Sequence, residues 1–406
     1  MLNLNISRNR AGIFGLLCLF SAYSHASPLS TEILLGDQKL DQILRMSDLN
    51  YDGDANDAGE MQVYFDASNA SGLASPTSNV YTITSTASGY QFFGNGDSDS
   101  VYRLRDLNLD GDAQDAREAN VWFSSDNAEG LSLNTPNGTA EGPDGAIYVV
   151  EADTLGNPSG DYVYRTEDLN GDGDANDAGE SSIWLDLTAL NPSSSPFEIS
   201  FDGSTAYIAD TLGRETNVLY RARDENGDGI VDSSEVAVFV DEDNTLGVPV
   251  DFAFDTWNQS LVIWEFLDFQ GPQSVFRLTD VDNNNVIDSS GEVKEIWNSD
   301  YLPNGFESLV AFAVAAGPDG ELMLTSNGGD DNQKNLIRLM DLNSDGDFFD
   351  VDETIVFASP ATNGSYPGRP RAISYLYTRV PNPGTIWLLA LGLVVAIAKR
   401  KIRIQP

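Results

Sequence analysis

Short apolar runs, separated by polar turns, fill the chain from about residue 32 to residue 377 and recur in a fixed order. In each recurrence two apolar residues precede an Arg, and an Asp-led polar segment begins three residues after that Arg, as in Val163-Tyr164-Arg165 before Asp168. The runs are rich in β-branched and aromatic residues and have no helical stripe of useful length between them. This pattern predicts a series of short strands.

The unit recurs six times, and the loop-starting aspartates lie 58, 62, 56, 56 and 61 residues apart. One strand follows each loop, and from the second copy on two more strand-like runs precede the Arg-bearing strand. In the third copy the first of these runs is expected over Leu131 to Asn134. Four short strands in a unit of this length predict an all-β chain that forms a six-bladed β-propeller.

The ends of the repeat region support a closed ring. The first copy has only three predicted strands, and Ala372 to Tyr377 is expected to supply the fourth. Closure of this kind removes sheet edges that would otherwise template aggregation. An open β-solenoid is the alternative.

The polar segment between the last two strands of each unit has the spacing D-x-[DN]-x-[DN]-G, which is typical of calcium-binding loops. Oxygens at positions 1, 3 and 5 converge on one point, position 7 offers a backbone carbonyl, and a later Glu can bind through both oxygens. Six copies in one register are hard to explain by ordinary turns, which need only two or three such residues. The predicted ligands, loop by loop, are Asp48, Asn50, Asp52, Asp54 and Glu60; Asp106, Asn108, Asp110, Asp112 and Glu118; Asp168, Asn170, Asp172, Asp174 and Glu180; Asp224, Asn226, Asp228, Ile230 and Glu235; Asp280, Asp282, Asn284, Val286 and Glu292; and Asp341, Asn343, Asp345, Asp347 and Glu353.

Only the fourth loop places its Glu at position 12, because the other loops carry it at position 13. In the fifth loop Asn285 stands in the place of the Gly, and a weaker site is expected there. The loops resemble those of EF-hands and dockerin modules, although strands flank them here. They are more similar to the calcium-loaded blade loops of integrin-type propellers, and that resemblance implies structural Ca²⁺ as the cofactor. The recurrent Arg is expected to pair with a carboxylate of its own or the neighbouring blade.

The N-terminal 26 residues have the pattern of a secretory signal peptide. Arg8 and Arg10 precede an apolar stretch, and Ser24-His25-Ala26 is a small-x-small cleavage site. Cleavage there would remove Cys18 and His25, the only cysteine and the only histidine. Disulfides, Cys or His zinc sites and His-based catalysis are therefore not expected.

The C-terminal segment, residues 380–406, combines Pro381 and Pro383, an apolar run over Thr385 to Ala398, and a basic end at Lys399 to Arg403. It resembles the PEP-CTERM sorting signal, with Asn382 where that family usually has Glu. The resemblance implies an exosortase-type processing enzyme as a partner and a transient inner-membrane anchor. A plain membrane anchor is the alternative. Both place the propeller, residues 27–379, outside the inner membrane, at the cell surface or in the extracellular space.

A net charge of −41 excludes nucleic acid as a partner, because phosphate binding needs clustered Lys and Arg. It also favours bound cations, since repulsion of that size opposes a compact state. Export, a sorting tail and cation-binding loops predict a calcium-binding structural or binding module at the cell surface, with extracellular polysaccharide or surface proteins as candidate partners.

The alternative function is a calcium-dependent propeller hydrolase, similar to lactonases or esterases. No catalytic residue is assigned, but Glu151, Asp153, Asp210 and Glu265 are candidate acids at the ends of second strands.

Overall fold

The computed structural model describes residues 31–76, 80–152, 160–210, 217–241, 248–266, 273–303, 311–326, 334–359 and 368–376. The predicted signal peptide and sorting signal lie outside these residues. Within them, no helix is long and apolar enough to span a membrane.

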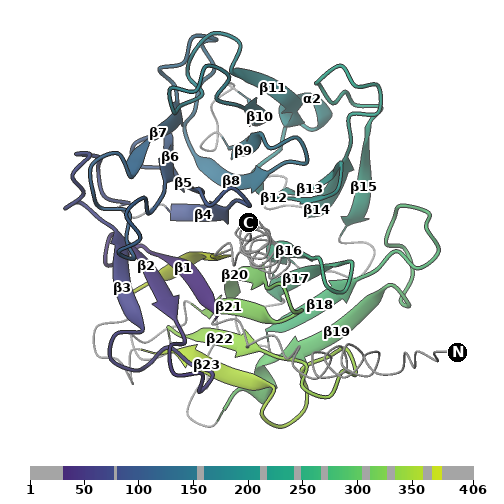
Figure 1. The fold of residues 1–406 in the computed structure, drawn as a ribbon. Helices are drawn as coiled ribbons and strands as arrows, with labels where there is room; N and C mark the ends of the chain where they lie inside the picture. The colour runs from purple at the N-terminus through teal and green to yellow at the C-terminus, as the bar shows by residue number, and fades with distance from the viewer. Residues whose placement is uncertain are drawn as a thin grey trace, which may run out of the picture.

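The described residues form six antiparallel four-stranded sheets arranged as blades around a ring (Figure 1). The predicted six-bladed β-propeller is therefore confirmed, and the acidic loops lie between the last two strands of each blade. In blade order the strands are β24 (Pro370–Tyr375), β1 (Glu32–Asp37), β2 (Gln42–Ser47) and β3 (Met61–Phe65); β4 (Val80–Ser85), β5 (Gln91–Asn95), β6 (Ser100–Leu104) and β7 (Ala119–Ser124); β8 (Pro136–Glu141), β9 (Ile147–Glu151), β10 (Tyr162–Thr166) and β11 (Ser181–Asp186); β12 (Pro196–Asp202), β13 (Thr205–Asp210), β14 (Val218–Ala222) and β15 (Val236–Asp241); β16 (Val248–Asp255), β17 (Ser260–Phe266), β18 (Ser274–Leu278) and β19 (Val293–Asn298); and β20 (Ala311–Ala316), β21 (Leu322–Ser326), β22 (Leu336–Leu339) and β23 (Thr354–Ala358).

Strands from distant parts of the chain close the first blade. The innermost strand β24 pairs antiparallel with β1, with Leu35 opposite Ile373. Closure by a C-terminal strand was predicted, and the observed strand starts two residues before the predicted one. Two short helical turns, α2 (Leu187–Leu190) and η3 (Ser299–Tyr301), follow β11 and β19 and were not predicted.

The strand expected over Leu131 to Asn134 is absent, and β8 instead occupies Pro136–Glu141. The side chain of Asn127 bonds both the N–H and the carbonyl of Leu131, which uses the backbone groups that a strand would need. β8 contains a Pro and a Gly, which disfavour strands. The Gly is needed because a Cβ at Gly138 would lie 2.9 Å from the Cα of Glu198 on the neighbouring innermost strand.

The hydrophobic core is divided among the interfaces between blades. Each of the six apolar clusters found in the described residues combines side chains of two neighbouring blades. Between the fifth and sixth blades, for example, Trp264 and Trp297 are fully buried in a cluster with Leu324 and Ile337. Every blade therefore needs both neighbours to bury its apolar faces.

The acidic loops also join neighbouring blades. The residue at loop position 8 is buried in every copy, and its N–H donates to a carbonyl on the last strand of the preceding blade at 2.6–2.8 Å. These residues are Ala55, Ala113, Ala175, Val231, Ile287 and Phe348. Each loop is therefore attached to the preceding blade through a backbone hydrogen bond.

Candidate functional site

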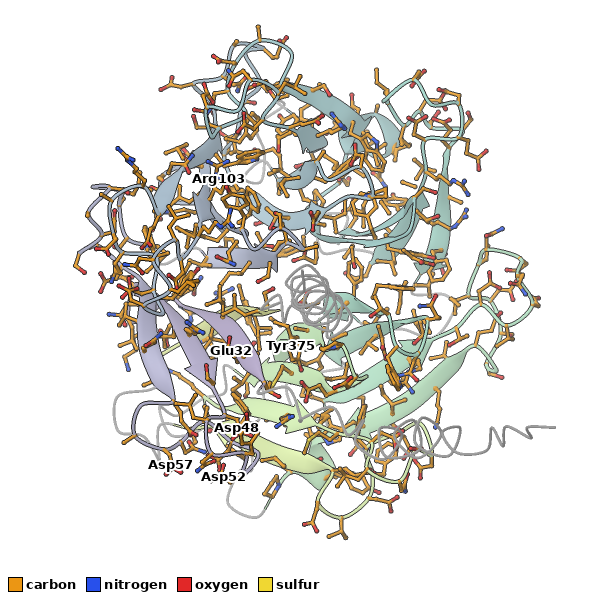
Figure 2. The ribbon with its side chains drawn as sticks, viewed as in Figure 1. Glu32, Asp48, Asp52, Asp57, Arg103 and Tyr375 are labelled. Carbon is orange, nitrogen blue, oxygen red and sulfur yellow. The ribbon has the colours of Figure 1, made fainter. Side chains whose placement is uncertain are left out.

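The first loop shows how the acidic residues converge. Oδ2 of Asp48 accepts the N–H of Gly53 at 3.0 Å, and Asn50 Nδ2 lies 2.9 Å from Asp52 Oδ2 and 2.6 Å from Asp57 Oδ2. Figure 2 shows Asp48, Asp52 and Asp57 gathered in this loop. Positions 1, 3 and 5 are therefore brought together as the spacing predicts, and position 10 joins them.

The same convergence recurs around the ring. The Asn at position 3 donates to the carboxylates at positions 5 and 10 in the second, third and sixth loops as well. In the fifth loop Asn284 donates to Asp282 and Asp288. Asn285 replaces the Gly there with φ +68°, and its N–H bonds Asp280 at 2.8 Å, as the Gly does elsewhere.

The late Glu occupies a different environment from these groups. In the first loop Glu60 Oε1 accepts the N–H of Leu49 at 2.9 Å, and Oε2 accepts the N–H of Asp57 at 3.0 Å. All six late glutamates accept backbone N–H bonds from both ends of their loops, and those at 60, 118, 180, 292 and 353 are at most 3% exposed. Each closes its loop through hydrogen bonds to the backbone.

The residues at position 7 point their side chains elsewhere. The carboxylates of Asp54, Asp112 and Asp174 accept the N–H of the residue two places on. Asp347 pairs with Lys294 at 2.9 Å, and Ile230 and Val286 have no side-chain oxygen. Position 7 would therefore serve a cation through its backbone carbonyl, as the sequence analysis expects.

The donor set of the loops fits a metal ion. Asp48 is only 4% exposed, and its buried Oδ1 has no hydrogen-bond partner within the part of the chain that the structure describes. In the fifth loop, carboxylate oxygens of Asp280, Asp282 and Glu292 lie within 4.8 Å of one another. Clustered carboxylate and amide oxygens are the ligands of hard divalent cations.

The recurrent Arg connects consecutive blades at several positions. Arg103, labelled in Figure 2, lies 3.6 Å from Asp168 of the next loop, and Arg338 lies 3.8 Å from Asp48 across the closure of the ring. Arg277 donates to the carbonyl of Gly346 in the next loop at 2.7 Å. Arg165 instead pairs with Asp144 and Glu167 of its own blade at 2.7 Å. Both expected kinds of pairing therefore occur.

The candidate acids at the ends of second strands are structural where they can be described. Glu151 accepts the backbone N–H groups of Asn134 and Thr135, and Asp210 accepts Ser195 N–H at 2.7 Å and the Ser194 hydroxyl at 2.6 Å. Both hold the segment that leads into an innermost strand. Asp153 and the side chain of Glu265 lie outside the described residues.

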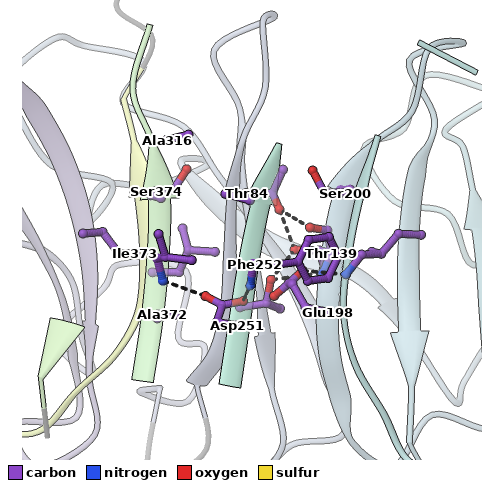
Figure 3. A pocket seen from close by; sticks show the side chains of 18 of the residues that line it. Thr84, Thr139, Glu198, Ser200, Asp251, Phe252, Ala316, Ala372, Ile373 and Ser374 are labelled. Atoms are coloured by element: carbon purple, nitrogen blue, oxygen red, sulfur yellow. Dashed lines mark hydrogen bonds between the residues drawn. The ribbon is translucent and has the colours of Figure 1, made fainter. Parts of the chain in front are cut away.

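A cavity of about 300 Å³ lies at the centre of the ring, lined by all six innermost strands. Hydroxyl groups line part of its wall, and Thr139 Oγ1 lies 3.0 Å from Thr82 Oγ1 and 2.8 Å from Thr84 Oγ1. Figure 3 shows Thr84, Ser200 and Ser374 in this cavity, which forms the central channel of the ring, together with two carboxyl groups. A cavity of this volume is at the small end of the range for ligand sites, roughly 300–1,000 Å³.

The two carboxyl groups, Glu198 of β12 and Asp251 of β16, lie side by side in Figure 3. Asp251 accepts the N–H groups of Val314 at 2.8 Å and Phe252 at 2.9 Å, whereas Glu198 accepts that of Ile199 at 2.9 Å. Burial raises the pKa of Asp251 to about 7 despite those donors. Burial and the neighbouring Asp251 also raise the pKa of Glu198 well above its usual range. Two buried neighbouring carboxyl groups oppose the ionisation of both, so the pair favours a state that carries one proton.

Sequence reasoning missed this pair, although a signal exists. Three of the innermost strands carry a Pro at or next to their first residue, in Pro136-Asn137-Gly138, Pro196-Phe197-Glu198 and Pro249-Val250-Asp251. A β-bulge follows each of these prolines, so the third residue of each triplet has the same register. Two acids at equivalent positions on the innermost strands face one channel.

No protein-family model matches the chain, and no curated protein matches it. Solved structures align with it at low identity. A gluconolactonase from Xanthomonas campestris is 18% identical over 73% of this chain and 79% of that one, with a TM-score of 0.45. A virginiamycin B lyase from Staphylococcus aureus is 18% identical over 77% and 78%, with a TM-score of 0.43. A regucalcin from Agrobacterium tumefaciens, described as a calcium-binding protein, is 15% identical over 73% and 81%, with a TM-score of 0.40.

The prediction of a binding or structural module is corrected by this comparison. The aligned proteins include a gluconolactonase and a lyase, which are enzymes and not structural modules. Alignments at this similarity show the fold alone.

Proposed function

We propose that the protein is a hydrolase that cleaves esters or lactones in its central channel. The observation that carries this proposal is the pair Glu198 and Asp251, two carboxyl groups with raised pKa values in one cavity. A pair in which one carboxyl keeps its proton while the other ionises near neutral pH is suited to general acid–base work.

A pair that carries one proton supplies both a base and an acid. Asp251, once ionised, accepts a proton from a water molecule, whose oxygen forms a bond to the carbonyl carbon of the substrate. Glu198, in its protonated form, donates a proton to the departing alkoxide oxygen as the carbon–oxygen bond breaks. The products are a carboxylic acid and an alcohol, joined in one molecule when the substrate is a lactone. Nearby hydroxyl groups such as Thr84 offer hydrogen bonds to the substrate.

We propose Ca²⁺ as the ion of the acidic loops, with oxygens of positions 1, 3 and 5 and of the acid at position 9 or 10 as the principal ligands. The late glutamates then act mainly as backbone anchors. The strand setting and the −41 net charge support a structural ion that offsets repulsion between carboxylates. We also propose that the protein is exported through its N-terminal signal and that an exosortase processes residues 380–406. Export would place the loops in an environment with millimolar calcium.

The test compares hydrolysis of 4-nitrophenyl butyrate and of δ-valerolactone by the wild type, Glu198→Gln and Asp251→Asn. Each substitution should lower kcat about 10²–10⁴-fold, the usual contribution of a general acid or base. Asp202→Asn is the matched control, because Asp202 is exposed at the end of the same strand as Glu198. Full activity in both channel variants, or no turnover of either substrate class by the wild type, would overturn the proposal.

A further inference from the structure

Each of the six innermost strands has a register shift near its start, one residue before the positions of Glu198 and Asp251. In β24 the extra residue is Arg371, between Pro370 opposite Asp37 and Ala372 opposite Gly36. The equivalent residue of β20 is Phe312, and Tyr81 lies within the shift of β4. Bulges re-aim side chains, and this one places a cation beside the channel-lining Ala372.

Aromatic rings and one amide hold the Arg371 side chain. Its guanidinium carbon lies 3.8 Å from the ring centroid of Phe312 and 5.4 Å from that of Tyr81. Its Nε donates to Gln38 Oε1 at 2.6 Å. Tyr81, one of the groups that hold Arg371, lines the central cavity, which Arg371 adjoins without being one of its lining residues.

Among the described residues, no carboxylate pairs with Arg371. This differs from the recurrent arginines, since Arg45 lies 3.0 Å from Glu32 and Arg338 lies 2.6 Å from Glu321. Burial, and to a lesser extent Arg369, lower the pKa of Arg371 to about 10. The group therefore stays charged at neutral pH, in a chain with 63 acidic residues.

A partly buried cation without an acidic partner is costly unless a ligand supplies the negative charge. The flat guanidinium lies against aromatic faces, and its Nε is already bonded, which leaves the terminal fork to recognise a planar anion. A carboxylate fits that fork through two parallel hydrogen bonds. The cavity of about 300 Å³ limits the ligand to a small molecule.

We propose that Arg371 is the specificity residue of the channel and binds a carboxylate carried by the substrate. This inference rests on the proposed hydrolase: the substrate class is an ester or lactone of a small molecule that also bears a free carboxylate. Arg371 fixes that carboxylate at the wall, and the ester reaches the Glu198–Asp251 pair.

The experiment compares two esters that differ only in the terminal charge, 4-nitrophenyl hexanoate and mono-4-nitrophenyl adipate. The wild type should hydrolyse the adipate ester with the higher kcat/KM. Arg371→Met should raise KM for that ester about tenfold or more, with little change for the hexanoate ester. Arg369→Met is the matched control: it removes the same charge two residues away at an exposed position and should change neither substrate. Equal loss for both esters in Arg371→Met would overturn the inference.

Binding measured without turnover separates this inference from the hydrolase proposal. Calorimetric titration with adipate should show binding to the wild type and to Glu198→Gln, and about tenfold weaker binding to Arg371→Met. Adipate binding with no ester hydrolysis would contradict the hydrolase proposal and support the carboxylate site. Unchanged adipate binding in Arg371→Met, or equally tight binding of inorganic phosphate by the wild type, would remove the site.

Arg371→Lys serves if Arg371→Met fails to fold, as judged by near-ultraviolet circular dichroism. It retains the charge but lacks the planar fork, and it should bind adipate several-fold more weakly than the wild type. Wild-type affinity in this variant would contradict recognition by the fork.

Discussion

At the residue scale, similar carboxyl groups play three roles according to their surroundings. Loop aspartates such as Asp52 are exposed and accept the side-chain amide of the Asn at position 3. Late glutamates such as Glu60 are buried and accept backbone N–H groups, and Asp251 is partly buried in the channel. The sequence motif specifies the first group well because spacing alone brings positions 1, 3 and 5 together. The motif does not distinguish residues that could bind an ion from residues that hold the loop backbone. Glu60 fits the spacing of an ion ligand, and yet both of its oxygens accept backbone N–H groups of its loop.

The raised pKa of Asp251 predicts a pH-dependent stability. The unfolded chain ionises this carboxyl near its usual pKa of 3.8, whereas the folded protein does so near 7. The folded state therefore binds the proton more tightly than the unfolded state. The free energy of unfolding consequently falls as pH rises from about 4 to 7. Asp251→Asn should therefore melt above the wild type at pH 8 and no higher than the wild type at pH 4. Thermal unfolding at both pH values checks this. A difference that is the same at pH 4 and pH 8 would argue against a perturbed carboxyl.

At the element scale, each acidic loop is a preformed unit. Its Glu bonds backbone N–H groups at both ends, and the residue at position 8 bonds the preceding blade. The sequence predicted where these loops lie, but not how they attach, because the eighth residue varies from Ala to Phe and only the backbone bond is constant. The misplaced strand at Leu131 to Asn134 has a related cause, since a long-range backbone contact at Gly138 overrides local preference there.

Two substitutions in the third loop can distinguish a residue that holds the loop backbone from a proposed calcium ligand. Glu180→Ala leaves buried N–H groups without acceptors and should cost about 1–3 kcal/mol even in excess chelator. Asp177→Ala, three residues earlier, should change stability little in chelator and should abolish most of the gain that calcium gives this loop. Thermal unfolding of both variants, with EDTA and with calcium, measures the contrast. If the two variants behaved alike in EDTA, the distinct roles would be wrong.

At the scale of the whole molecule, the ring depends on contacts that run from each blade to the next and from the last to the first. The sequence predicted this closed arrangement because the repeat count, the three-stranded first copy and the late strand all pointed to it. It did not predict the channel chemistry, since Glu198 and Asp251 lie 53 residues apart and meet only when the ring forms.

Ring closure gives one stability prediction. Arg338 is 13% exposed and contacts Glu321 at 2.6 Å, Asp48 at 3.8 Å and the Gly53 carbonyl at 3.4 Å, so Arg338→Met leaves partly buried acids unpaired. Arg165 is more exposed and pairs within its own blade. Arg338→Met should therefore lower the melting temperature clearly more than Arg165→Met. Equal shifts in the two variants would show that contacts across the closure add nothing.

Calcium binding gives another stability prediction. With extracellular-type affinity of roughly 10⁻⁴–10⁻³ M, 10 mM calcium should add about 1.4–2.7 kcal/mol for each loop that fills. The melting temperature should rise with calcium and fall in EDTA, and calorimetry should register uptake by more than one loop. A melting temperature indifferent to both additions would rule out the proposed ion.

The pairing of β24 with β1 also sets the order in which the protein can assemble. Residues 370–375 complete the sheet that begins at Glu32, so the first blade cannot be finished until nearly the whole described chain has been made. The other five sheets are each built from consecutive strands and can form as they emerge. A growing or translocating chain therefore holds a row of partly covered sheets until the last strand arrives, and a channel able to bind substrate exists only after that step.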